Sequence, residues 1–141
     1  MPRLLILSQD ASEYHRLLTQ ADLPGLSMYA VQGATDTITC SDEFDLLLGE
    51  PALIRHVVDC LPNLRWVQCT WAGVEPLLQP GMRRDYTLTN VRFVYGPQIS
   101  EYVFGYLLLI ARGTLSRLHA QQEARWDTTL PGTLRRKTLG L

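Results

Sequence analysis

The feature that most constrains the fold is an alternation of short apolar runs with helical segments over the first 90 residues. The first run, 3–7, is apolar at every position from Leu4 to Leu7, which is typical of a strand covered on both faces. Further strands are expected at 26–31, 44–49, 65–69 and 86–89. Strands separated by helical crossovers run parallel. The alternation therefore predicts an α/β fold, an open parallel sheet of about five strands with helices on both faces.

Proline and glycine mark the limits of the intervening helices. A helix over 11–21 is followed by the breakers Pro24 and Gly25. Pro51 opens a second helix that is expected to reach position 60, because a proline in the first turn removes no helical hydrogen bond. Further helical structure is expected at 74–78 and, as a single weak turn, within 32–43.

The pattern changes after Pro97, where apolar residues recur along one helical face as far as Leu118. This spacing predicts one helix over about 97–122, which at 1.5 Å per residue would be about 40 Å long and would bridge domains or subunits. We therefore expect two parts, a domain at 1–96 and a linker helix with an arm at 97–141, whose last residues resemble the start of another strand.

Composition argues against several classes of function. The apolar stretch at 102–111 is far shorter than the roughly 20 residues of a membrane span, and the N-terminus has too short an apolar run for a signal peptide, so we expect a cytoplasmic protein without a membrane partner. Basic residues prevail after position 60 without an aromatic stacking pattern, so no nucleic acid is expected as a partner.

Cys40, Cys60 and Cys69 have no CxxC spacing, which favours buried free thiols over disulfides or a metal site.

Ligands of open parallel sheets bind beyond the carboxyl ends of the strands, which directs attention to two loops. In the first, Gly73 lies between a strand and a helix, where unpaired backbone N–H groups can bind a small anion such as a carboxylate. The alternative is that Gly73 only makes a tight turn.

In the second loop, 90–97, Arg92 is a candidate to face an anionic ligand, and Phe93 and Tyr95 are candidates for the wall of an apolar pocket. A surface ion pair for Arg92, and a place in the core or in an interface for the two rings, are the alternatives. The three histidines lie on predicted helices, and Cys69 has no nearby base, so we assign no catalytic residue.

Five motifs, in their order and spacing, resemble the NAD(P)-dependent D-2-hydroxyacid dehydrogenases, most of all the glyoxylate/hydroxypyruvate reductase branch: WVQCTWAGVE, LTNVR, GPQISEYVFGYLL, WDTTL and KTLGL. The resemblance implies a flavodoxin-like substrate domain, joined by the long helix to a Rossmann cofactor domain that is absent here. It also implies that backbone N–H groups of Ala72, Gly73 and Val74 bind the carboxylate of a small 2-oxo or 2-hydroxy acid. Phe93 departs from the family pattern, since relatives commonly have glycine beside the arginine.

The family's glycine-rich loop and its catalytic arginine, glutamate and histidine would lie beyond Leu141, so no catalytic or cofactor-binding residue is expected in this chain. The resemblance implies a truncated D-isomer-specific 2-hydroxyacid dehydrogenase, whose intact form would reduce glyoxylate or hydroxypyruvate with NAD(P)H. The chain alone is expected to be inactive, to bind neither NAD nor NADP, and to form a homo-oligomer through the 97–122 helix. The alternative is a stand-alone α/β module that binds a small acid or mediates dimerisation.

Overall fold

The computed structural model describes residues 1–33 and 42–140. The chain divides into two compact units, residues 1–92 and residues 93–141. The assignment of a substrate domain to 1–96 and of a linker with an arm to 97–141 stays a prediction.

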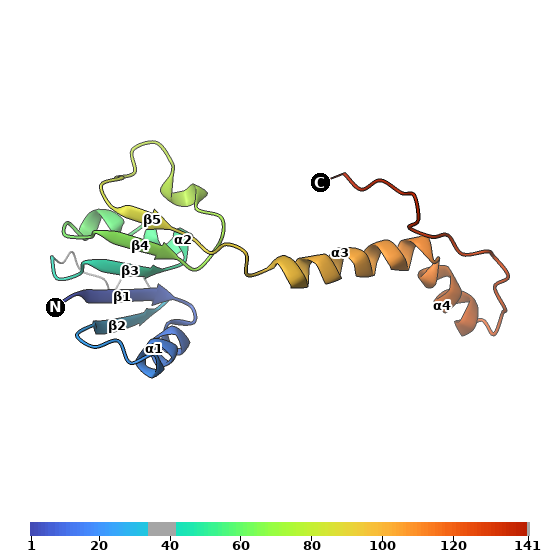
Figure 1. Cartoon of the computed structure of the whole chain (residues 1–141), viewed down its shortest axis with the longest axis horizontal. Helices are drawn as coiled ribbons and strands as arrows, with labels where there is room; N and C mark the ends of the chain where they lie inside the picture. Colours follow the sequence, from blue (N-terminus) through green and yellow to red (C-terminus); the bar gives the residue numbers. More distant parts are fainter. Residues whose placement is uncertain (34–41, 141) are drawn as a thin grey trace. The chain divides into compact units, whose positions relative to one another are not determined.

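The first unit is built on a five-stranded sheet in the order β2-β1-β3-β4-β5, in which every pair of neighbours is parallel (Figure 1). The strands are β1 (Arg3–Ser8), β2 (Ser27–Gln32), β3 (Leu46–Gly49), β4 (Trp66–Cys69) and β5 (Thr87–Thr89). This strand order is that of flavodoxin-like folds. The predicted fold class is confirmed, and each predicted strand is present with small shifts at its ends.

The hydrophobic core lies on both faces of the sheet, and β1 contributes to both. Leu5 and Leu7 pack on one face with α2 (Pro51–Ile54) and the 3₁₀ helices η1 (Val58–Cys60) and η2 (Glu75–Leu77). Leu4 and Ile6 pack on the other face, which α1 (Ala11–Gln20) covers in part. Burial on both faces is the reason why the run in β1 is apolar at successive positions rather than at alternate ones.

Several predicted helices differ from those observed. The helix expected from Pro51 to position 60 is divided into α2 and η1. The helix expected over 97–122 is divided into α3 (Gly96–Ala111) and α4 (Thr114–Gln122), because Gly113 adopts a left-handed conformation with φ of 62° that ends α3. Residues 134–140 form no strand. Most of the predicted turn in 32–43 lies outside the described residues.

The cysteines correct one prediction. Cys69 is free and buried, as predicted, but Cys60 is disulfide-bonded, so the expectation of a free thiol was wrong there. Cys40 lies outside the described residues. Within the described ranges, no helix is both long and apolar enough to cross a membrane, and no three His, Cys, Asp or Glu side chains gather in a way that could hold a metal ion.

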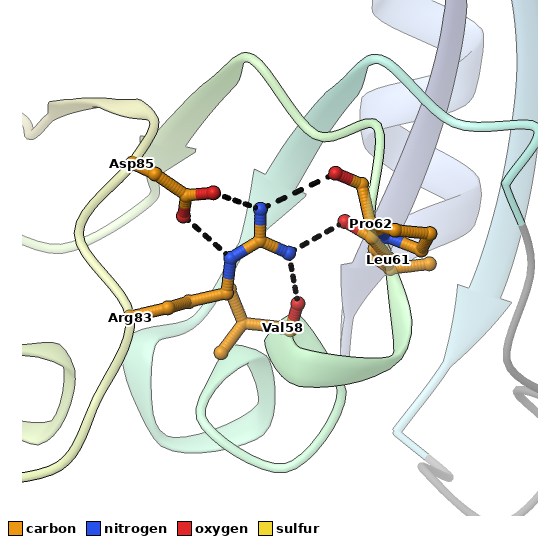
Figure 2. A network of polar contacts seen from close by, with 5 residues as sticks. All are labelled: Val58, Leu61, Pro62, Arg83 and Asp85. Carbon is orange, nitrogen blue, oxygen red and sulfur yellow. Dashed lines mark hydrogen bonds and ion pairs between the residues drawn. The ribbon is translucent and has the colours of Figure 1, made fainter.

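Arg83 lies in the irregular segment between η2 and β5, and its side chain is hydrogen-bonded to η1 and to the turn after η1 (Figure 2). Its guanidinium is paired with Asp85, with Nε–Oδ1 and Nη2–Oδ2 distances of 2.6 and 2.8 Å. The same group donates to the carbonyl oxygens of Val58, Leu61 and Pro62 at 3.1, 2.8 and 3.4 Å. These carbonyls belong to η1 and to the turn that follows it. Those of Val58 and Leu61 also accept from the N–H groups of Leu61 and Leu64, at 3.3 and 3.1 Å, so the guanidinium adds a second donor to each.

Among residues 93–140, few side chains of the second unit are buried. None of the residues of α3 is buried, and Ala120 is the buried residue of α4. Apolar side chains exposed on these two helices are Ile99, Tyr102, Phe104, Tyr106, Leu108, Ile110, Leu115 and Leu118. Such a surface is typical of a face that another polypeptide covers.

Candidate functional site

The two loops singled out in the sequence lie next to each other. One follows β4 and the other follows β5, and these parallel strands are neighbours in the sheet. The Nδ2 of Asn90 donates to the carbonyl oxygen of Ala72 at 2.6 Å, and the N–H of Val91 donates to the carbonyl oxygen of Trp71 at 3.3 Å. The fold therefore brings the segment 72–74 and the residues just before Arg92 together at the carboxyl edge of the sheet.

The segment 72–74 offers backbone donors. Ala72 and Gly73 are exposed and Val74 is half-buried. None of their N–H groups donates a hydrogen bond to any part of the chain that the structure describes. Three successive unpaired N–H groups at a strand end form the kind of site that binds a carboxylate.

Gly73 contributes space rather than an unusual backbone conformation, since it is not in the left-handed region. A Cβ at this position would lie 2.7 Å from Oε2 of Glu75, whose side chain is exposed and free to turn away. Sequence reasoning did not consider Glu75. Its carboxylate lies beside the predicted anion site and, being negative, opposes the binding of an acid there.

Arg92 is exposed, and its Nε donates to Oδ1 of Asn90 at 3.2 Å. It forms no ion pair with the residues that the structure describes, which leaves its charge available to a ligand. This positions a guanidinium on the loop that is hydrogen-bonded to Ala72, as an acid-binding role requires.

Phe93 has a φ of 64° and is 98% exposed. The left-handed region favours glycine, which gives a physical reason for the glycine that the family resemblance implies at this position. Tyr95 is also exposed and precedes α3. Both rings belong to the second unit, and their role as a pocket wall stays a prediction.

The strand order reveals a position that sequence reasoning missed. The chain leaves β1 for β2 on one side and places β3 on the other, so the switch point of the sheet lies between the carboxyl ends of β1 and β3. There, Ser8 is 1% exposed and its Oγ donates to Oε1 of Glu50 at 2.6 Å. The N–H of Gln9 donates to the same oxygen at 3.0 Å, and the N–H of Asp10 donates to Ser8 Oγ at 3.0 Å.

Thr70, after β4, continues the row of polar side chains formed by Ser8 and Glu50. Gly49 is paired with Cys69 in the β3–β4 register, so Glu50 and Thr70 follow them side by side. Thr70 is 8% exposed, and its hydroxyl oxygen has no hydrogen-bond partner among the described residues. Only the register of the strands groups these residues, since 8, 50 and 70 show no common motif in the sequence.

The surroundings of Cys69 disfavour a nucleophilic thiolate. Burial raises the pKa of its thiol to about 11. The thiol is therefore protonated at neutral pH, and the thiolate needed for attack is scarce. The core position of Cys69 supports a structural role.

A wide groove of about 980 Å³ lies elsewhere, at the amino-terminal edge of the sheet, where Asp45, Trp66 and Thr87 contribute to its lining. The candidate loops lie at the opposite, carboxyl edge. Size alone therefore does not identify the site, and the unpaired donors of 72–74 are the better guide.

Comparisons with known proteins bear on the fold of the chain. No protein-family model and no curated protein matches the sequence. The chain is similar to the crystal structure of a D-isomer specific 2-hydroxyacid dehydrogenase family protein from Aeromonas salmonicida subsp. salmonicida, with 39% identity and a TM-score of 0.83 over 94% of this chain and 43% of that one.

A D-isomer specific 2-hydroxyacid dehydrogenase from Xanthobacter autotrophicus, solved in complex with NADPH and MES, has 21% identity and a TM-score of 0.71 over 92% of this chain and 42% of that one. At that identity the likeness shows the fold alone. The chain thus spans less than half the length of either protein. Structural likeness over nearly the whole chain confirms the resemblance to the D-isomer specific 2-hydroxyacid dehydrogenase family.

Proposed function

We propose that this chain is the acid-binding part of a D-isomer-specific 2-hydroxyacid dehydrogenase, which when intact reduces a 2-oxo acid such as glyoxylate or hydroxypyruvate with NADH or NADPH. The observation that carries the proposal is the row of unpaired N–H groups at 72–74, next to the loop that bears Arg92. The N–H groups bind the carboxylate of the acid, and Arg92 adds the positive charge.

The nicotinamide cofactor supplies the hydride when it is bound. The structure solved with NADPH supports cofactor use by proteins of this fold. The residues of this chain do not themselves fit a dinucleotide, because the sequence contains no GxGxxG loop to bind the pyrophosphate. We therefore assign this chain the binding and orientation of the acid, and no catalytic residue.

The first test is a titration of the isotope-labelled chain with oxalate, a stable analogue of a 2-oxo acid, followed by NMR. We expect the amide signals of Gly73 and Val74 to shift, with a dissociation constant on the order of 1 mM, because only part of the site is present. Arg92→Gln should weaken binding about tenfold, since a charged hydrogen bond contributes about 1.5 kcal/mol or more. The same chain should reduce glyoxylate with NADH or NADPH no faster than a blank.

Arg84→Gln is the matched control for the titration, because Arg84 is exposed and its hydrogen bond goes to the carbonyl oxygen of Leu78, away from both loops. It should bind oxalate as the unaltered chain does. An absence of shifts at 72–74 would contradict the acid site, and turnover above the blank would contradict the expected inactivity.

We also propose that the helices α3 and α4, within 97–122, pair with a second copy of the chain. Support comes from the exposed apolar side chains of these helices. The same observation favours the alternative function, a module that dimerises.

Light scattering coupled to size-exclusion chromatography should therefore show a dimer that dissociates on dilution. Ile110, which is 72% exposed, offers the variant Ile110→Asp, and this change should weaken the dimer at least about tenfold, because it places a charge in an apolar interface. Leu17→Asp on α1 is the control, an exposed leucine outside the proposed interface. A monomer at every concentration would contradict this proposal.

A further inference from the structure

The hydroxyl of Thr70 is buried without a partner among the described residues, two positions before the segment 72–74. Its backbone is fixed, because the N–H of Thr70 donates to the carbonyl oxygen of Gly49 at 2.9 Å. The side-chain oxygen has no hydrogen-bond partner among the described residues. Buried hydroxyl groups in native proteins are nearly always paired, so an unpaired one is typical of a group whose partner is a ligand or a bound water.

The neighbouring polar groups do not supply that partner. Ser8 Oγ both donates to Glu50 and accepts from the N–H of Asp10. Oε1 of Glu50 already accepts from Ser8 and from the N–H of Gln9. Neither residue is hydrogen-bonded to Thr70, whose hydroxyl therefore has no hydrogen-bond partner among the described residues.

We propose that Thr70 is a substrate-binding residue, whose hydroxyl donates a hydrogen bond to an oxygen of the acid that is bound at 72–74. This inference rests on the proposed function. A carboxylate or oxo oxygen only accepts hydrogen bonds, and a threonine hydroxyl can donate one without adding charge. The hydroxyl oxygen is closed to solvent, so this hydrogen bond requires a local shift of the exposed residues that follow it, Trp71 first.

The test compares Thr70→Val, which keeps the shape and removes the hydroxyl, with Thr70→Ser, which keeps the hydroxyl. Oxalate is titrated into each variant, and the amide shifts of Gly73 and Val74 report binding. We expect the valine variant to bind about five- to tenfold more weakly, the effect of one lost hydrogen bond, and the serine variant to bind within about twofold of the unaltered chain. Thermal unfolding of the valine variant should occur at the same or a higher temperature, because no internal hydrogen bond is lost.

Equal binding by Thr70→Val and the unaltered chain would overturn the role of Thr70 and leave the acid site in place. Equal weakening in the valine and serine variants would also overturn it, because it would indicate packing rather than hydrogen bonding. Absence of any shift in the unaltered chain would overturn the proposed function and this inference together. If the valine variant does not fold, Thr70→Ala replaces it in the comparison with serine.

Discussion

Gly49→Ala is expected to destabilise the first unit by about 3 kcal/mol or more, because the added methyl group has no space. A Cβ at Gly49 would lie 2.1 Å from the carbonyl oxygen of Leu7 and 3.3 Å from its Cβ. Leu7 and Gly49 are paired between β1 and β3, and the N–H of Glu50 donates to the same oxygen at 3.3 Å. The neighbouring backbone cannot retreat without separating the two central strands.

Urea unfolding, followed through the amide signals of β1, measures this effect in the first unit. Gly73→Ala is the matched control, because its Cβ would meet only the mobile end of Glu75. We expect this control to change the free energy of unfolding by about 0.5 kcal/mol or less. Equal stability of the two variants would contradict the conclusion that Gly49 and Leu7 are too close to admit a methyl group.

Arg83→Ala is expected to lower the free energy of unfolding by about 3 kcal/mol. The side chain of Arg83 is 18% exposed, and its removal takes away the pairing with Asp85 and one donor from each of the carbonyl oxygens of Val58 and Leu61 (Figure 2). Arg83→Lys should recover only part of the loss, because an ammonium group lacks the planar fork that reaches Asp85 and both carbonyls at once.

Urea unfolding again provides the measurement, with Arg84→Ala as the control. Arg84 donates to a single carbonyl, that of Leu78 at 2.7 Å, so its removal should cost less than about 1 kcal/mol. If Arg83→Ala lowered the free energy of unfolding no more than Arg84→Ala does, the stabilising role of Arg83 would be contradicted.

The Arg83–Asp85 pair also makes the stability of the first unit depend on pH. The hydrogen bond from Arg83 lowers the pKa of the Asp85 carboxyl below its ordinary value. The pair therefore stabilises the fold above the pKa that Asp85 has in the unfolded chain, and this stabilisation disappears as the pH falls through the folded-state pKa. Arg83→Ala should remove this part of the acid sensitivity, since the carboxyl then has no guanidinium beside it.

The sheet class could be predicted because its signals are local. A run such as Leu4 to Leu7 needs no knowledge of its neighbours to indicate a strand buried on both faces. The ends of the helices were harder to predict from the sequence. The apolar spacing continues across Gly113, and only the left-handed conformation of that glycine shows that the helix ends.

By itself, the sequence determined the existence of the strands and the two loops with Gly73 and Arg92, because apolar runs and short motifs are contiguous in the chain. The tertiary structure alone decided that Ser8, Glu50 and Thr70 form one row, and that Arg83 reaches the carbonyls after η1. The physical reason is that strand order, register and side-chain reach join residues far apart in the chain, and no local pattern specifies which of them will meet.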